Sequence, residues 1–214
     1  MIKEVKMKIR ILKILALSFS IFVILAHHKV LAVTELLDAL AERETGETSY
    51  SRQCSTVNRL GFTGRFQLGE ALLHDLGYYK DDSGYYRPDS GHKRKNTWGG
   101  RFKNGLSSYQ DLLDNVNQIQ EKIIIEAFLM NKEIIEEALS TKIHKISEEY
   151  TASGIIAGAH LCGPYAVIKY FQNGASAADE FGTRLEEYME EFSDYVTNSE
   201  KLKLKKALKK IKAK

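Results

Sequence analysis

Apolar side chains recur at helical spacing through most of this chain, and glycines follow several of these runs. In the first run, Leu37, Leu40 and Ala41 share one face, and Gly46 ends the pattern. Runs of this kind are predicted at 34–45, 68–76, 108–123, 131–139, 151–162, 164–173 and 183–195. Amphipathic helices bury their apolar faces by packing against one another. The pattern therefore predicts a mainly α-helical domain.

Two segments lack this periodicity. Residues 46–66 are polar and interrupted by glycines, which predicts a loop with short extended pieces. Residues 78–106 combine glycines and charges with several aromatics, which predicts a loop or a small hairpin. The aromatic residues of this second segment are Tyr78, Tyr79, Tyr85, Tyr86 and Trp98. They are expected either to line a ligand site or to fold back on the core.

The N-terminal segment has the organisation of a secretory signal peptide. A basic start is followed by an uncharged run of thirteen residues from 14 to 26, and then by Val30-Leu31-Ala32. This order predicts cleavage after Ala32, removal of residues 1–32, and export to the periplasm or the medium. The apolar run is short for a bilayer span, and a membrane anchor formed by an uncleaved signal is the alternative.

Charge is distributed unevenly along the chain. The total is +3, with +5 in residues 1–32 and +8 in residues 201–214, which leaves −10 for the body over 33–200. The body is expected to form one domain, and its acidic charge disfavours nucleic acid as a partner. The Lys-rich tail over 201–214 is expected either to contact an anionic membrane or cell-wall polymer as an amphipathic helix, or to remain solvated.

The chain contains two cysteines, Cys54 and Cys162. Exported proteins tend to pair their cysteines, so a disulfide between the two is one expectation and two free thiols are the other. Neither a metal-type cysteine spacing nor a paired-histidine motif is present, so neither a zinc site nor another cofactor is expected.

Glu44 is the candidate catalytic residue that the pattern itself indicates. It occupies the next position on the apolar face of the first predicted helix, just before Gly46, and a glycine-rich stretch over 61–67 follows. Desolvation of a carboxyl group disfavours its charged form, and such a group can act as a general acid near neutral pH. The alternative for Glu44 is a frayed helix end in solvent.

Three segments occur in an order that is typical of one family. They read RETG at Arg43–Gly46, GFTGRFQLGE at Gly61–Glu70 and AHLCGPYAV at Ala159–Val167. Together they resemble the lysozyme-like superfamily, in particular the bacterial soluble lytic transglycosylase type of domain. The resemblance covers most of residues 34–172. Two residues depart from it, because His160 and Leu161 stand where the family has tyrosine and asparagine.

The resemblance implies an α+β lysozyme-like fold, with a helical domain and a small loop or β-hairpin region that lines a glycan cleft. It also implies cleavage of the β-1,4 bond between N-acetylmuramic acid and N-acetylglucosamine in peptidoglycan, with 1,6-anhydro ends. Glu44 is then the catalytic acid and base, and the expected substrate-binding residues are Gln67, His160, Tyr165 and Ser55. The alternative for Gln67 is a side chain that bonds only to the backbone of its turn, and the alternative for His160 is a structural histidine. The two altered residues leave room for a non-catalytic cell-wall binding or assembly protein. A lysozyme-type hydrolase is a further alternative.

Overall fold

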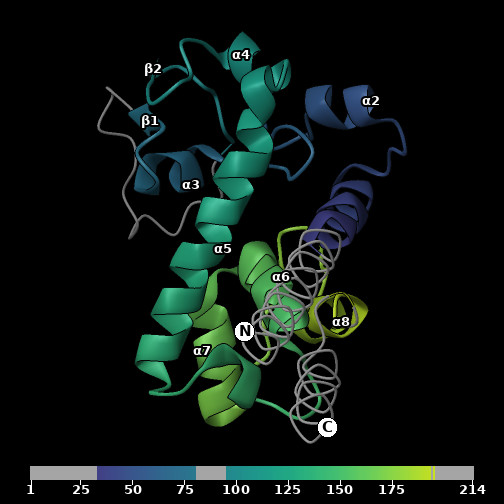
Figure 1. The fold of residues 1–214 in the computed structure, drawn as a ribbon, viewed down its shortest axis with the longest axis vertical. Coiled ribbons are helices and arrows are strands. Elements are labelled where there is room, and N and C mark those ends of the chain that lie inside the picture. Colours follow the sequence, from purple (N-terminus) through teal and green to yellow (C-terminus); the bar gives the residue numbers. More distant parts are fainter. Residues whose placement is uncertain (1–32, 81–94, 194, 196–214) are drawn as a thin grey trace, which may run out of the picture.

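The computed structural model describes residues 33–80, 95–193 and 195, which form a mainly helical structure (Figure 1). The predicted signal peptide over 1–32, the tail over 201–214 and both Tyr85 and Tyr86 lie outside the described residues. Within the part that is described, no helix is long and apolar enough to cross a membrane.

One long helix, α5, runs through the middle of the molecule, and the first helix spans 33–45 (Figure 1). The labelled helices are α2 (Tyr50–Ser55), α3 (Glu70–Asp75), α4 (Tyr109–Leu113), α5 (Ile119–Ala138), α6 (Ala152–Cys162), α7 (Pro164–Asn173) and α8 (Leu185–Glu191). Short 3-10 turns lie at Val116–Gln118 and Ile143–Lys145. Strands β1 (Tyr79–Lys80) and β2 (Arg101–Phe102) pair antiparallel, with Tyr79 opposite Phe102. The prediction of a mainly α-helical fold is confirmed, and the segment over 78–106 contributes the two short strands.

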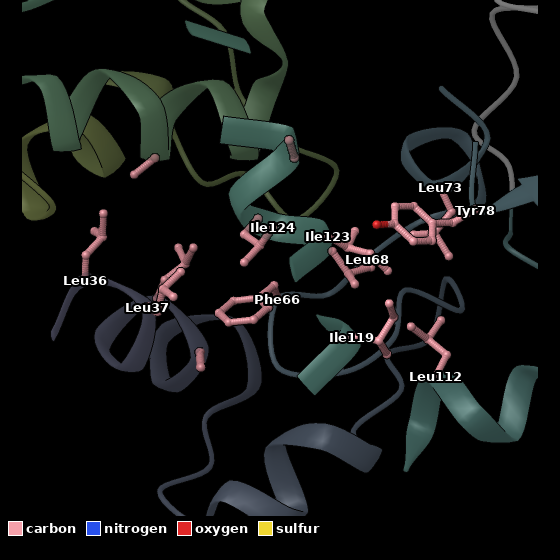
Figure 2. Packing of buried hydrophobic residues seen from close by; sticks show 14 of the residues in the cluster. Leu36, Leu37, Phe66, Leu68, Leu73, Tyr78, Leu112, Ile119, Ile123 and Ile124 are labelled. Carbon is pink, nitrogen blue, oxygen red and sulfur yellow. The ribbon is translucent and has the colours of Figure 1, made fainter. Parts of the chain in front are cut away.

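Two apolar clusters form the core, and both include residues of the central helix α5. The first joins the helix over 33–45, the segment around Phe66 and the N-terminal half of α5. Phe66 is fully buried, and in Figure 2 it lies near Leu37 and Ile124. The second cluster joins the C-terminal half of α5 to α6, α7 and α8. Because α5 contributes to both clusters, it holds the two ends of the molecule together.

Small residues on α6 allow α8 to pack unusually close. A Cβ atom on Gly154 would lie 2.1 Å from the backbone oxygen of Met189, and one on Gly158 would lie 2.6 Å from the Met189 side chain. Any larger residue at these positions would push the two helices apart. The contact sets the position of Tyr188, the neighbour of Met189 on α8.

Local capping signals predicted several helix ends well. The helix over 33–45 stops at Gly46, whose φ is +67°. Helix α7 begins at Pro164 and is followed by Gly174, whose φ is +71°, as expected from proline at a helix start and glycine after its end. Ser108 caps α4 through a capping box with Asp111.

The long helix predicted over 108–123 is wrong, because the chain breaks after Leu113. Asn115, Asn117 and Gln118 take left-handed backbone conformations there, and the Asn115 side chain accepts a hydrogen bond from the Gln120 amide at 2.8 Å. This side chain substitutes for the missing helical bonds and starts α5 in a new direction.

A helix start at Asn131 is also wrong, since α5 continues through this residue to Ala138. Asn131 is buried, and its Nδ2 donates to the backbone oxygen of Ala159 at 3.4 Å. Its polar group therefore contacts α6 and does not cap its own helix.

The segment over 46–66 contains a helix, α2, that the loop prediction missed. Only Gln53 and Cys54 are buried in this short helix, so its sequence carries no sustained apolar period. Gln53 holds it in place, because its Nε2 donates to the oxygen of Glu47 at 2.7 Å and its Oε1 accepts from Arg65 at 3.0 Å.

The aromatic residues of the hairpin region fold back on the protein. Tyr78 and Tyr79 are buried, and Trp98 contacts Tyr79 and Tyr109 at ring centroid distances of 5.6 Å and 5.3 Å. For these residues the core alternative is therefore correct.

Candidate functional site

Glu44 lies at the end of the helix over 33–45 with most of its side chain covered. The side chain is 16% exposed, which follows from its place next to the fully buried Leu40 and Ala41. The last helical turn is closed by a hydrogen bond from the Gly46 amide to the Glu42 oxygen at 2.8 Å. The frayed, solvated end that was the alternative is therefore wrong.

Tyr188 of α8 is the principal partner of Glu44. Its phenolic O–H donates a hydrogen bond to Oε1 of Glu44, and the tyrosine is 2% exposed. Burial and the neighbouring Glu44 carboxylate raise the pKa of Tyr188 far above its ordinary value of 10. Tyr188 therefore remains a donor throughout the physiological pH range. Because Oε1 of Glu44 accepts this bond, a proton on the carboxyl group belongs on Oε2.

His160 approaches the same carboxylate from α6. Its Nε2 lies 3.6 Å from Oε1 of Glu44, and its side chain is 9% exposed. The edge of the imidazole also contacts Phe128, with ring centroids 6.4 Å apart. In Figure 1 the helix over 33–45 lies next to α6 and α8, which bring His160 and Tyr188 to Glu44.

Gln67 reaches this region from a tight turn in the glycine-rich segment. Its backbone φ is +44°, a conformation that costs about 1 kcal/mol for a residue other than glycine. Its Nε2 donates to the oxygen of Gly64 at 2.9 Å and to that of Thr56 at 3.4 Å. These bonds fix the amide, and its Oε1 is buried without a hydrogen-bond partner among the described residues.

These groups line one cleft of about 410 Å³, and its lining includes Glu44, Gln67 and His160. The residues that line it are Arg43, Glu44, Asn58, Phe62, Gln67, His160, Leu161, Asp179, Glu180, Phe181, Thr183 and Tyr188. The lining combines a carboxyl group, an imidazole and hydrogen-bond acceptors with apolar surface. Such a site suits a neutral polar ligand with apolar faces.

Two predicted substrate-binding residues are not in this lining. Ser55 is exposed on α2, where its Oγ donates to the backbone oxygens of Ser51 and Arg52. Tyr165 is 67% exposed near the start of α7. Neither lines the cleft, because each stands on the solvent side of its helix.

The expected disulfide is also absent, since Cys54 and Cys162 are both free thiols. Cys54 is buried beside Asn115, whose Nδ2 lies 3.6 Å from its sulfur. Cys162 ends α6, where burial and the nearby Asp179 and Glu186 carboxylates raise its pKa to about 11. The two thiols thus belong to separate surroundings, and both resist ionisation.

Several residues of the cleft were missed from the sequence. Tyr188 falls within a predicted helix and has no local signal of its own. Glu180 and Phe181 precede Gly182, which marked only a break between helices. Among the described residues, no group of three or more His, Cys, Asp or Glu side chains could hold a metal ion.

The electrostatic character of the cleft is acidic. Glu44, Asp179 and Glu180 face it, while Arg43 is engaged by Glu191 at 3.1 Å. An anionic ligand group would be repelled here, and a group that donates hydrogen bonds would be favoured.

Comparisons with protein-family models, curated proteins and solved structures found no match for this chain. The chemistry of the cleft therefore rests on its own residues.

Proposed function

We propose that this protein is a peptidoglycan lytic transglycosylase that cleaves the β-1,4 bond between N-acetylmuramic acid and N-acetylglucosamine. The observation that carries the proposal is that the described residues engage only one of the two carboxyl oxygens of Glu44. One carboxyl oxygen accepts a hydrogen bond from Tyr188. The other has no hydrogen-bond partner among the described residues, so it is available to a substrate.

The proposed reaction uses Glu44 first as an acid and then as a base. Its Oε2 gives a proton to the glycosidic oxygen as the bond from that oxygen to the muramic acid breaks. The resulting carboxylate takes a proton from the C6 hydroxyl of the same muramic acid, whose oxygen forms the new bond to C1. The product is a 1,6-anhydro ring, and Glu44 is protonated again. Tyr188 keeps its hydrogen bond to Oε1 throughout and so holds the carboxyl group in a fixed orientation.

Gln67 supports a glycan as the substrate. Its unpartnered Oε1 is a hydrogen-bond acceptor held in a fixed direction by the two bonds of its Nε2. Sugar hydroxyl and acetamido groups are donors that such an acceptor binds. The resemblance of the segments around Glu44, Gln67 and His160 to lytic transglycosylases points to the same substrate.

The proposal includes export, with residues 1–32 as the signal peptide and residues 33–200 as the catalytic domain. Peptidoglycan lies outside the cytoplasmic membrane, so the enzyme acts in the periplasm or after secretion. The Lys-rich tail over 201–214 would contact anionic lipid or cell-wall polymer.

A lysozyme-type hydrolase is the second candidate, and the carboxylate of Glu180, which lines the same cleft as Glu44, favours it. An inverting hydrolase uses a second carboxylate to activate water. Mass spectrometry separates the two reactions, because an anhydro end is lighter than a reducing end by one water.

The test is digestion of purified sacculi by the full chain, its Glu44→Gln variant and a matched Glu42→Gln control on the same helix. We expect Glu44→Gln to slow release of soluble muropeptides by about 10²- to 10⁴-fold, the usual effect of losing an acid–base group. The exposed Glu42 should tolerate its change. Digestion by Glu44→Gln at the wild-type rate would refute the assignment. Binding of the wild type to sacculi without soluble product would instead favour a non-catalytic cell-wall protein.

A further inference from the structure

The turn between α7 and α8 is built around Asp179. Its Oδ1 accepts hydrogen bonds from the amides of Phe181 at 2.9 Å and Thr183 at 2.7 Å. A bridge between Ala178 and Arg184 closes the turn. The Asp179 carboxylate is thus used to hold the backbone. The turn over 178–184 therefore presents the two residues that follow Asp179 in a defined geometry.

Glu180 is the first of these residues, and its carboxylate has no structural explanation. Its Oε2 is buried and has no hydrogen-bond partner among the described residues. A buried carboxylate oxygen without a donor destabilises a fold, so this side chain is not there to stabilise the turn. It lines the same cleft as Glu44.

A second unpartnered acceptor lines the same cleft and comes from another segment. Within the part of the chain that is described, the buried side-chain oxygens and nitrogens that lack a partner are Gln67 Oε1 and Glu180 Oε2. Gln67 as a whole is 9% exposed. The two residues come from segments more than a hundred positions apart and meet in one cleft. Two unpartnered acceptors in one cleft call for a ligand that carries several hydrogen-bond donors.

Phe181 adds an apolar surface next to Glu180. It is 51% exposed although it lines the cleft. The Arg59 guanidinium lies 4.9 Å from the centroid of its ring, which restrains the ring through a cation–π contact. An exposed aromatic ring beside a hydrogen-bond acceptor matches the apolar face and polar edge of a pyranose.

We propose that Glu180 and Phe181 form a sugar-binding wall of the cleft, in which Glu180 accepts a hydrogen bond from an uncharged acetamido N–H or hydroxyl group. Phe181 packs against the face of the same sugar ring. This inference rests on the proposed function and names the part of the glycan that the turn recognises. The acidic cleft excludes an anionic group at this position.

The experiment measures binding of N-acetylglucosamine oligomers, of glucosamine oligomers and of an alternating N-acetylglucosamine and N-acetylmuramic acid tetrasaccharide by titration calorimetry. The full chain carries Glu44→Gln to prevent turnover, and Glu180→Ala, Glu180→Gln and Phe181→Ala are each added to it. Glu187→Ala is the matched control, because Glu187 is exposed on α8 and does not line the cleft.

We expect Glu180→Ala to weaken binding of the acetylated oligomers by about 10- to 100-fold, the usual effect of losing a hydrogen bond to a charged group. Glu180→Gln keeps an acceptor oxygen but loses the charge that strengthens the bond, so it should weaken binding by less than Glu180→Ala does, by up to about 10-fold. Phe181→Ala should weaken binding by about 10-fold. Glu187→Ala should bind as the parent does.

Thermal unfolding distinguishes the loss of a ligand contact from a loss of protein stability in Glu180→Ala. Removing an unpartnered buried carboxylate should leave the melting temperature unchanged or raise it. A clear fall in the melting temperature of Glu180→Ala would assign Glu180 a structural role and overturn the inference.

Two further outcomes separate this inference from the proposed function. Glycan binding by the parent that Glu180→Ala leaves unchanged would overturn the inference alone. A parent that binds none of these oligomers, together with a wild type that does not digest sacculi, would overturn both. Tighter binding of glucosamine oligomers than of acetylated oligomers, lost equally in Glu180→Gln and Glu180→Ala, would mean that Glu180 binds a charged amino group. This result would overturn the inference that the donor on the ligand is uncharged.

Discussion

Arg65 and Gln67 lie two positions apart and are both buried, yet they differ in how far their polar groups have hydrogen-bond partners. Arg65 donates to Asp38 at 2.7 Å, to Glu121 at 2.5 Å and to Gln53 at 3.0 Å. Gln67 directs its Nε2 to two backbone oxygens and leaves its Oε1 without a partner among the described residues. One segment thus contributes to a satisfied polar cluster and to an unsatisfied one.

The satisfied cluster holds the fold together. Through Arg65 it connects the helix over 33–45 with α2 and α5, which are distant in sequence. The guanidinium also lies 4.4 Å from the centroid of the Tyr50 ring. The cleft has the reverse property, because its unpartnered acceptors at Gln67 and Glu180 are satisfied only when a donor enters. Buried polar groups therefore stabilise one region, whereas in the other, two buried oxygens lack a partner among the described residues.

The largest expected loss of stability comes from a substitution in the satisfied cluster around Arg65. Arg65→Leu should lower the free energy of unfolding by about 3 kcal/mol, because it leaves Glu121, which is 17% exposed, without its cation. Urea unfolding at neutral pH measures this. Arg52→Leu is the control, since Arg52 is 74% exposed in its pair with Glu47 and should change stability by less than about 0.5 kcal/mol. Equal effects of the two variants would contradict the structural role of Arg65.

A smaller, pH-dependent effect is expected at Glu136, a satisfied carboxylate on α5. Burial acts to raise its pKa, but hydrogen bonds from the Ile143 amide, Lys132 and Lys142 outweigh it and lower the pKa from 4.5 to about 2. A lowered pKa stabilises the fold above pH 4.5, and this contribution is lost as the pH falls towards 2.

Glu136→Gln should therefore destabilise the protein at pH 7 by on the order of 1 to 3 kcal/mol, because the lysines are partly exposed and screened. The difference from wild type should vanish near pH 2. Urea unfolding of both proteins between pH 7 and pH 2 provides the measurement. A difference that does not depend on pH would show that the charge of Glu136 contributes nothing.

The smallest stability effect is expected in the cleft. Gln67→Met loses the hydrogen bonds to Gly64 and Thr56 but also removes the unpartnered oxygen, so the net change should stay within about 1 kcal/mol. Its binding of N-acetylglucosamine oligomers should weaken by about 10-fold, against no change for the exposed Gln110→Met. A loss of stability as large as that of Arg65→Leu, with binding intact, would mean that the two clusters do not differ.

Much of the helical framework could be predicted because its signals are local. Pro164 and Gly174 delimit α7, and Gly46 ends the first helix, because each residue restricts the backbone at its own position. The break after Leu113 and the continuation through Asn131 could not be predicted. Asn115 accepts a hydrogen bond from the backbone amide of Gln120, and Asn131 donates one to the backbone oxygen of Ala159 on α6. Packing of the surrounding elements decides which partner each side chain takes.

The residues of the candidate site also divide into those expected from the sequence and those that only the tertiary structure identified. From the sequence alone, Glu44 was expected on an apolar helix face before a stop, with Gln67 and His160 beside it. The tertiary structure brought Tyr188 and Glu180 into the cleft, and it left Ser55 and Tyr165 outside the lining and the cysteines unpaired. The physical reason is the distance along the chain over which each feature is determined. Helical period and backbone conformation are set by residues that are neighbours in the sequence. The partner of a buried polar group is set by which elements pack together, as α8 packs on the glycines of α6.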